Sequence, residues 1–232
     1  DFLKNNFTQN RDEVTILYQE TYDKRVKKFC TNLGYTFIEL PDKKELKIGN
    51  DFDIICGKVP FYDSWVMIKD GNQNMLNVND CVLEDPSLVH NIKKYTKNAD
   101  IDVLFTQFSY ASFSDPENRS YRARKQLETI KLQNDVLSPK NIIPFASFIY
   151  FAHEENFYMN DSINTPEVVE DYINKNLNVD SIWLKPNENW VVGDNKDNEE
   201  SINYWMKFYS NLQTLPKIKS LKTYSLNELE EK

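Results

Sequence analysis

A succession of short, strand-like segments between Leu46 and Asp80 restricts the fold of this chain more than any other feature. The segments are rich in β-branched and aromatic residues and are bounded by Gly, Asn or Asp, as in strands joined by tight turns. The corner Asp70-Gly71-Asn72 is the strongest of these turn signals. The pattern predicts an antiparallel meander that ends on the carboxylate of Asp80.

The residues before the meander favour a strand, a helix and a second strand. Residues 14–18 and 36–40 have strand composition, and the apolar positions of residues 22–33 recur at helical spacing until Gly34. Such a unit is typical of layered α/β proteins. Further along the chain, we expect helices over residues 85–97, 119–136, 168–175 and 201–212, and strands over residues 102–108 and 181–186.

The chain shows neither an internal repeat nor a linker long enough to divide it. We therefore expect one α/β (α+β) domain over residues 1–232. With 40% hydrophobic and 13% aromatic residues, the chain is predicted to be globular. The net charge of −8 argues against a nucleic-acid partner, which calls for a basic face.

The sequence contains no run of about 18 apolar residues, and its start lacks a signal-peptide pattern. These observations predict a cytoplasmic protein with no membrane partner. Cys30, Cys56 and Cys81 are odd in number, widely spaced and outside any CxxC motif. They are predicted to be buried thiols, and neither a disulfide framework nor a structural zinc site is indicated.

The most apolar and aromatic run, residues 141–161, delivers His153 with Glu154 and Glu155 beside it. An apolar segment that ends in titratable groups often presents chemistry at the edge of a core. Neutral imidazole is a common metal ligand, so His153 is a candidate ligand, and the adjacent carboxylate of Glu154 could orient it or serve as a base. The alternative is a core strand that only surfaces at a histidine.

Two further groups of residues could carry chemistry. Asp80 follows an apolar strand, which suits a metal ligand or a general base, or else it caps the next turn. Arg119, Arg122 and Arg124 lie at the start of a predicted helix, where they could bind an anionic group or form a solvated face. Nucleophile-elbow, Walker, dinucleotide-binding and kinase motifs are absent from the sequence.

Three segments resemble the metallo-β-lactamase superfamily, in particular the branch of domains related to CMP-N-acetylneuraminate hydroxylase. They are residues 63–81 (DSWVMIKDGNQNMLNVNDC), residues 100–116 (DIDVLFTQFSYASFSDP) and residues 140–161 (KNIIPFASFIYFAHEENFYMND) with the following SINTPE. Their order and spacing are similar to those of the family over roughly residues 12–195. The resemblance implies part of a four-layer αβ/βα sandwich with a metal centre, zinc above all, with iron or manganese as alternatives.

In that resemblance, Asp80 matches the metal-bridging aspartate. His153 matches either the last metal histidine or a histidine that lines the substrate pocket. In the second register, Leu184-Lys185-Pro186-Asn187 stands where a metal histidine normally follows a late strand, so the sequence departs from the family there. The HxHxDH loop of the family is also missing. Because residues 1–7 resemble the segment just downstream of that loop, we expect an N-terminal portion that carries it.

The resemblance implies a metal-dependent hydrolase, or its C-terminal half, with Asp80 and His153 as catalytic and metal-binding residues. His153, Glu154, Arg119 and Arg122 would contact a small substrate, such as an anionic sugar or nucleotide-sugar ester. The expected protein associations are with an N-terminal half or a second copy of the chain. The alternative is a non-catalytic binding or assembly module that kept the fold and lost its metal centre.

Overall fold

The computed structural model describes residues 11–219, so the prediction on residues 1–7 lies outside the described part of the chain. The chain divides into two compact units. The first combines the residues up to Phe105 with Asp135–Lys140, and the second combines Thr106–Asn134 with the residues from Asn141 onward. Within residues 11–219, every helix is too short or too polar to cross a membrane.

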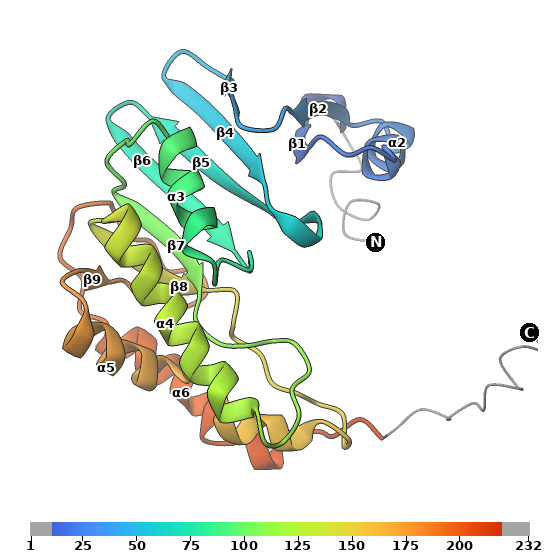
Figure 1. The fold of residues 1–232 in the computed structure, drawn as a ribbon. Coiled ribbons are helices and arrows are strands. Elements are labelled where there is room, and N and C mark those ends of the chain that lie inside the picture. Colours follow the sequence, from blue (N-terminus) through green and yellow to red (C-terminus); the bar gives the residue numbers. More distant parts are fainter. Residues whose placement is uncertain (1–10, 220–232) are drawn as a thin grey trace, which may run out of the picture. The chain divides into compact units, whose positions relative to one another are not determined.

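The first unit begins with the predicted strand, helix and strand. After a 3-10 turn, η1 (Arg11–Glu13), strand β1 (Thr15–Gln19) pairs in parallel with β2 (Thr36–Leu40), and α2 (Arg25–Asn32) connects them (Figure 1). Helix α2 starts three residues later than the spacing predicts. Lys24, the residue before it, has a left-handed backbone with φ of 53°, so the right-handed helix cannot extend back through this residue.

The predicted meander is confirmed in the same unit. Strands β3 (Lys44–Lys47), β4 (Phe52–Lys58), β5 (Ser64–Asp70) and β6 (Gln73–Asn79) are antiparallel neighbours in this order. A 3-10 turn, η2 (Pro60–Tyr62), joins β4 to β5. The next neighbour of β6 is β7 (Val103–Gln107), and α3 (Pro86–Tyr95) lies between them in the sequence. Ile55, Met67 and Leu76 are almost fully buried in this sheet.

Gly57 in β4 is required by the packing of this sheet. It stands opposite Trp65 of β5, whose side chain is 1% exposed. A Cβ atom at Gly57 would lie 2.2 Å from ring atoms Cε2 and Cζ2 of Trp65. The indole ring therefore occupies the space that any other residue at this position needs.

The second unit contains helices around two short parallel strands. The end of β7 is followed by β8 (Asn141–Phe145) and β9 (Asp180–Ser181) as neighbours, with β8 and β9 parallel. Helices α4 (Arg119–Leu137, whose last three residues belong to the first unit), α5 (Pro166–Asn176) and α6 (Glu199–Tyr209) accompany them, with 3-10 turns η3 (Phe157–Ser162) and η4 (Leu212–Thr214) (Figure 1). Phe108 and Trp183 meet edge to face in the core, and Phe148 stacks on Trp205 at 3.8 Å.

The run 141–161, for which a core strand was the alternative, and the expected strand 181–186 form strands over only part of their length. The run 141–161 is a strand only to Phe145, since Ala146 has a left-handed φ of 60°. The expected strand 181–186 reduces to its first residue within β9. The N–H of Trp183 donates to Asn198 Oδ1 at 3.0 Å instead of to a strand partner. The predicted mixed α/β class is nevertheless confirmed.

Candidate functional site

Asp80 lies in the first unit, directly after β6. The strand that carries it is anchored by Leu76 and Val78, both 0% exposed, and Asp80 itself is exposed. Its Oδ1 accepts a hydrogen bond from Nδ2 of the neighbouring Asn79. Asp80 is therefore an accessible carboxylate on a rigid support.

A second carboxylate, Asp63, stands next to Asp80. Asp63 immediately precedes β5 and Asp80 immediately follows β6, and these two strands pair from Val66–Asn77 to Asp70–Gln73. Burial raises the pKa of Asp63, and the negative charge of Asp80 raises this pKa further. Two neighbouring carboxylates repel each other, so a pair of this kind often marks a functional site.

Sequence reasoning did not select Asp63 as a site residue, although a signal for it exists. The turn at Gly71-Asn72 joins Asp70 to Gln73, which pair with each other, so the turn alone fixes the register of the whole hairpin. Counting outward from the turn brings the start of β5 and the end of β6 together, with Asp63 and Asp80 just beyond them.

Cys81 follows this pair and is buried, as are Cys30 and Cys56. Burial raises the pKa of the Cys81 thiol to about 12, and the charges of Asp63 and Asp80 act in the same direction. The prediction of buried thiols is therefore confirmed. A thiol with such a pKa stays protonated at neutral pH and is not a ready nucleophile.

A complete set of metal ligands is not assembled within the described part of the chain. Nowhere in residues 11–219 do three or more His, Cys, Asp or Glu side chains gather so that they could hold a metal ion. Catalytic zinc sites use three protein ligands. The carboxylates of Asp63 and Asp80 therefore suit a hard divalent cation in kind but are too few to hold it alone.

His153 and Glu154 lie in the second unit, where a C-terminal segment, residues 216–218, runs beside them. Ile218 N–H donates to Ala152 O at 2.8 Å, and Glu154 N–H donates to Ile218 O at 3.1 Å. His153 forms an isolated parallel bridge with Ile218. The imidazole is half-buried and the Glu154 side chain is exposed. We call residues 216–218 the strap.

Arg119 and Arg122 also lie in the second unit, in the first turn of α4. The Arg119 guanidinium donates to Pro116 O and lies 5.9 Å from the ring centre of Tyr158. Asp161 is 4.0 Å away. Arg122 is exposed. The residues predicted from the sequence are thus divided, with Asp80 in the first unit and the others in the second.

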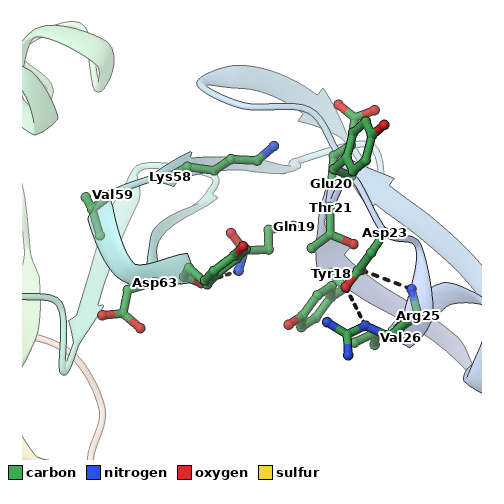
Figure 2. A pocket seen from close by; sticks show the side chains of 12 residues that line it. Tyr18, Gln19, Glu20, Thr21, Asp23, Arg25, Val26, Lys58, Val59 and Asp63 are labelled. Carbon is green, nitrogen blue, oxygen red and sulfur yellow. Dashed lines mark hydrogen bonds and ion pairs between the residues drawn. The ribbon is translucent and has the colours of Figure 1, made fainter.

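A pocket of about 690 Å³ lies in the first unit, close to the carboxylate pair. Its walls come from residues 18–26, at the end of β1 and the start of α2, and from residues 58–63, between β4 and β5 (Figure 2). Asp63 is one of the lining residues. The sequence did not indicate this pocket because its two walls are more than thirty residues apart in the chain.

No protein-family model matches the chain, and no curated protein matches it. Solved structures do resemble it. One is a mutant of the CmlA β-hydroxylase, with a TM-score of 0.49 and 13% identity over 72% of this chain and 38% of that chain. Another is Zn²⁺-bound PqqB from Methylobacterium extorquens, with a TM-score of 0.36 and 12% identity over 53% of this chain and 41% of that chain.

A third similar structure is a candidate zinc-dependent hydrolase of the metallo-β-lactamase superfamily from Thermotoga maritima. Its TM-score is 0.34, with 13% identity over 62% of this chain and 62% of that chain. One of the three structures thus carries the name of the superfamily that the sequence resembles. The chain spans less than two thirds of the length of each.

Proposed function

We propose that this chain is part of a metal-dependent hydrolase of the metallo-β-lactamase fold, and that Asp80 with Asp63 supplies carboxylate ligands to its divalent cation. The observation that carries the proposal is that Asp63, just before β5, and Asp80, just after β6, lie near enough for the charge of Asp80 to raise the pKa of Asp63. A cation between them removes the repulsion that the bare pair imposes on the sheet. A metal of this kind activates water for attack on an ester or amide.

Zinc is the first candidate, with iron or manganese as alternatives, and further ligands have to come from residues that the structure does not describe. His153, Glu154, Arg119 and Arg122 are the proposed contacts for the substrate. Arginine at a helix start suits a phosphate or carboxylate group. An anionic sugar or nucleotide-sugar ester is the proposed substrate class.

Metal analysis tests the proposal. The purified protein is stripped with a chelator, reloaded with zinc, manganese or iron(II), and its metal content is measured by mass spectrometry. Asp80→Asn and Asp63→Asn are each expected to weaken metal binding at least about tenfold, since each removes one of few ligands. Asp70→Asn, at the opposite end of the same hairpin, is the matched control and should bind as the parent does.

A folded protein that takes up none of these metals, or keeps its metal in both variants, contradicts the proposal. The first of these results supports the second candidate, a binding or assembly module without a metal centre. That candidate is favoured by the absence of a three-ligand group within residues 11–219. Repeating the analysis on the chain produced together with its upstream coding region shows whether an HxHxDH loop supplies the remaining ligands.

A further inference from the structure

The pocket between residues 18–26 and residues 58–63 points to a ligand of its own. We propose that it binds a small organic anion that carries a planar ring. A volume of about 690 Å³ is within the range of pockets that enclose one small molecule. The cation, the aromatic rings and the backbone of the pocket would bind such a ligand without a bound metal.

Lys58 is the cation that this pocket offers to a ligand. The other cation in its walls, Arg25, is engaged by Asp23 with 2.5 Å between Nε and Oδ2. Glu20, another lining residue, is paired with Lys24 at 3.2 Å. Within residues 11–219, the Lys58 ammonium is left without an acidic partner, and the residue as a whole is half-buried. An anionic ligand would supply the ion-pair partner that the Lys58 ammonium lacks within these residues.

The direction of the side chains supports this assignment. Lys58 extends from the end of β4 toward the segment with Gln19 and Glu20, while the carboxylate of Asp63 points away from that segment (Figure 2). The ammonium therefore faces the pocket, and the carboxylate that would compete with an anionic ligand is turned aside.

Tyrosine rings supply the apolar surface of the pocket. Tyr18, Tyr22 and Tyr62 line it, and Tyr22 and Tyr62 are 103% and 91% exposed. Two large rings left in water beside one pocket are available to stack on a flat ligand. A bare phosphate or sulfate would use Lys58 alone, so the proposal requires a ring as well as a charge.

The backbone that presents Tyr62 is strained. Phe61 and Tyr62 have φ of 68° and 66°, the left-handed region that bulky residues rarely adopt. A turn with positive φ at both central positions favours Asn-Gly, so Phe-Tyr is a costly choice here. Gln19 Nε2 donates to Tyr62 O at 2.6 Å and holds the turn against β1. The strain indicates that these side chains serve a purpose other than folding.

Direct binding of matched probes tests the proposal. The probes are 2-naphthoate, which has a planar ring and a charge, 2-naphthamide, which has the planar ring without the charge, and cyclohexanecarboxylate, which has the charge without a planar ring. Calorimetry in the presence of EDTA keeps the test independent of the proposed metal site. Naphthoate is expected to bind best. Lys58→Met should weaken its binding at least about tenfold and leave naphthamide unchanged.

Two further variants separate binding from folding. Lys47→Met removes an exposed lysine of β3 outside the pocket and should bind naphthoate as the parent does. The double variant F61N/Y62G places the favoured residues in the turn, so it should unfold at the same or a higher temperature and lose naphthoate binding. The proposal is overturned if the three probes bind equally, if Lys58→Met binds naphthoate normally, or if naphthoate does not bind at millimolar concentration.

Discussion

Replacing Gly57 by alanine is expected to destabilise the protein through a clash with one ring. The added Cβ would lie 2.2 Å from Trp65 Cε2 and Cζ2, whereas carbon atoms in contact are about 3.5–4.0 Å apart. One of the two strands therefore has to shift by more than about 1 Å, and the Trp65 side chain in the way is 1% exposed. Overpacking of this kind costs about 1–3 kcal/mol. We expect a loss near the upper end, about 3 kcal/mol.

Urea unfolding followed by far-ultraviolet circular dichroism measures the effect, and the chain provides a matched control. A Cβ at Gly49 would meet the Cβ of Phe52 at 3.6 Å, an ordinary contact, and Gly49 has no positive φ. Gly49→Ala is therefore expected to change the free energy of unfolding by less than about 1 kcal/mol, in the stabilising direction, because alanine reduces the freedom of the unfolded chain.

A double-mutant cycle identifies the clashing partner. Two of the three ring atoms that the new Cβ would meet, Cζ2 and Nε1, have no counterpart in phenylalanine, so Gly57→Ala in the Trp65→Phe background should cost less than about 1 kcal/mol. The reasoning is refuted if Gly57→Ala is as harmless as Gly49→Ala. It is equally refuted if its cost is the same with Trp65 present and with Trp65 removed.

Other expected outcomes concern buried polar groups. Burial raises the pKa of Glu188. The N–H of Lys185 and the side chains of Lys196 and Ser201 lower this pKa by more, to about 2, below the ordinary 4.5. Glu188 therefore stabilises the fold above pH 4.5 and loses this effect as pH falls toward 2, so Glu188→Gln should cost about 2 kcal/mol at pH 7 and much less at pH 2 in thermal unfolding. Asn164→Ala removes amide hydrogen bonds to two buried carbonyls; we expect a loss of about 3 kcal/mol in urea unfolding, against almost none for the exposed Asn174→Ala. Because burial, with nearby carboxylates, raises the pKa of Cys81 to about 12, Ellman's reagent should titrate three thiols in denaturant and almost none in the native protein; fast native labelling would contradict this burial.

The sequence was sufficient to predict the elements whose pattern is local. The meander up to Asp80 was predictable because alternation and the Gly71-Asn72 turn fix both strand direction and register. The sequence-based prediction failed where a side chain replaces a strand hydrogen bond, as at Trp183. The hydrophobic periodicity around Trp183 carries no information about Asn198, which accepts its N–H from fifteen residues away. Expected bounds also differ at Lys24, where the left-handed backbone is not encoded by residue type.

The candidate site was predictable to the same extent. Asp80 was found because a carboxylate after an apolar strand is a local signal. Asp63 and the pocket around Lys58 were not found, since both depend on pairing across a turn or between distant segments. Assigning Arg119, Arg122, Glu154 and His153 to a substrate stays a prediction. This assignment follows from a resemblance and from residue type. Both indicate where a residue lies in the chain, but neither shows which group its side chain contacts.

The strap has a consequence for association with other chains. Residues 216–218 satisfy the N–H of Glu154 and the C=O of Ala152 in the way that an added strand would. Because it is tethered to the same polypeptide, the strap competes at an effective concentration on the order of millimolar. A foreign extended peptide therefore has to bind this edge tighter than millimolar to replace it, and a chain shortened before Pro216 would lose that protection beside His153.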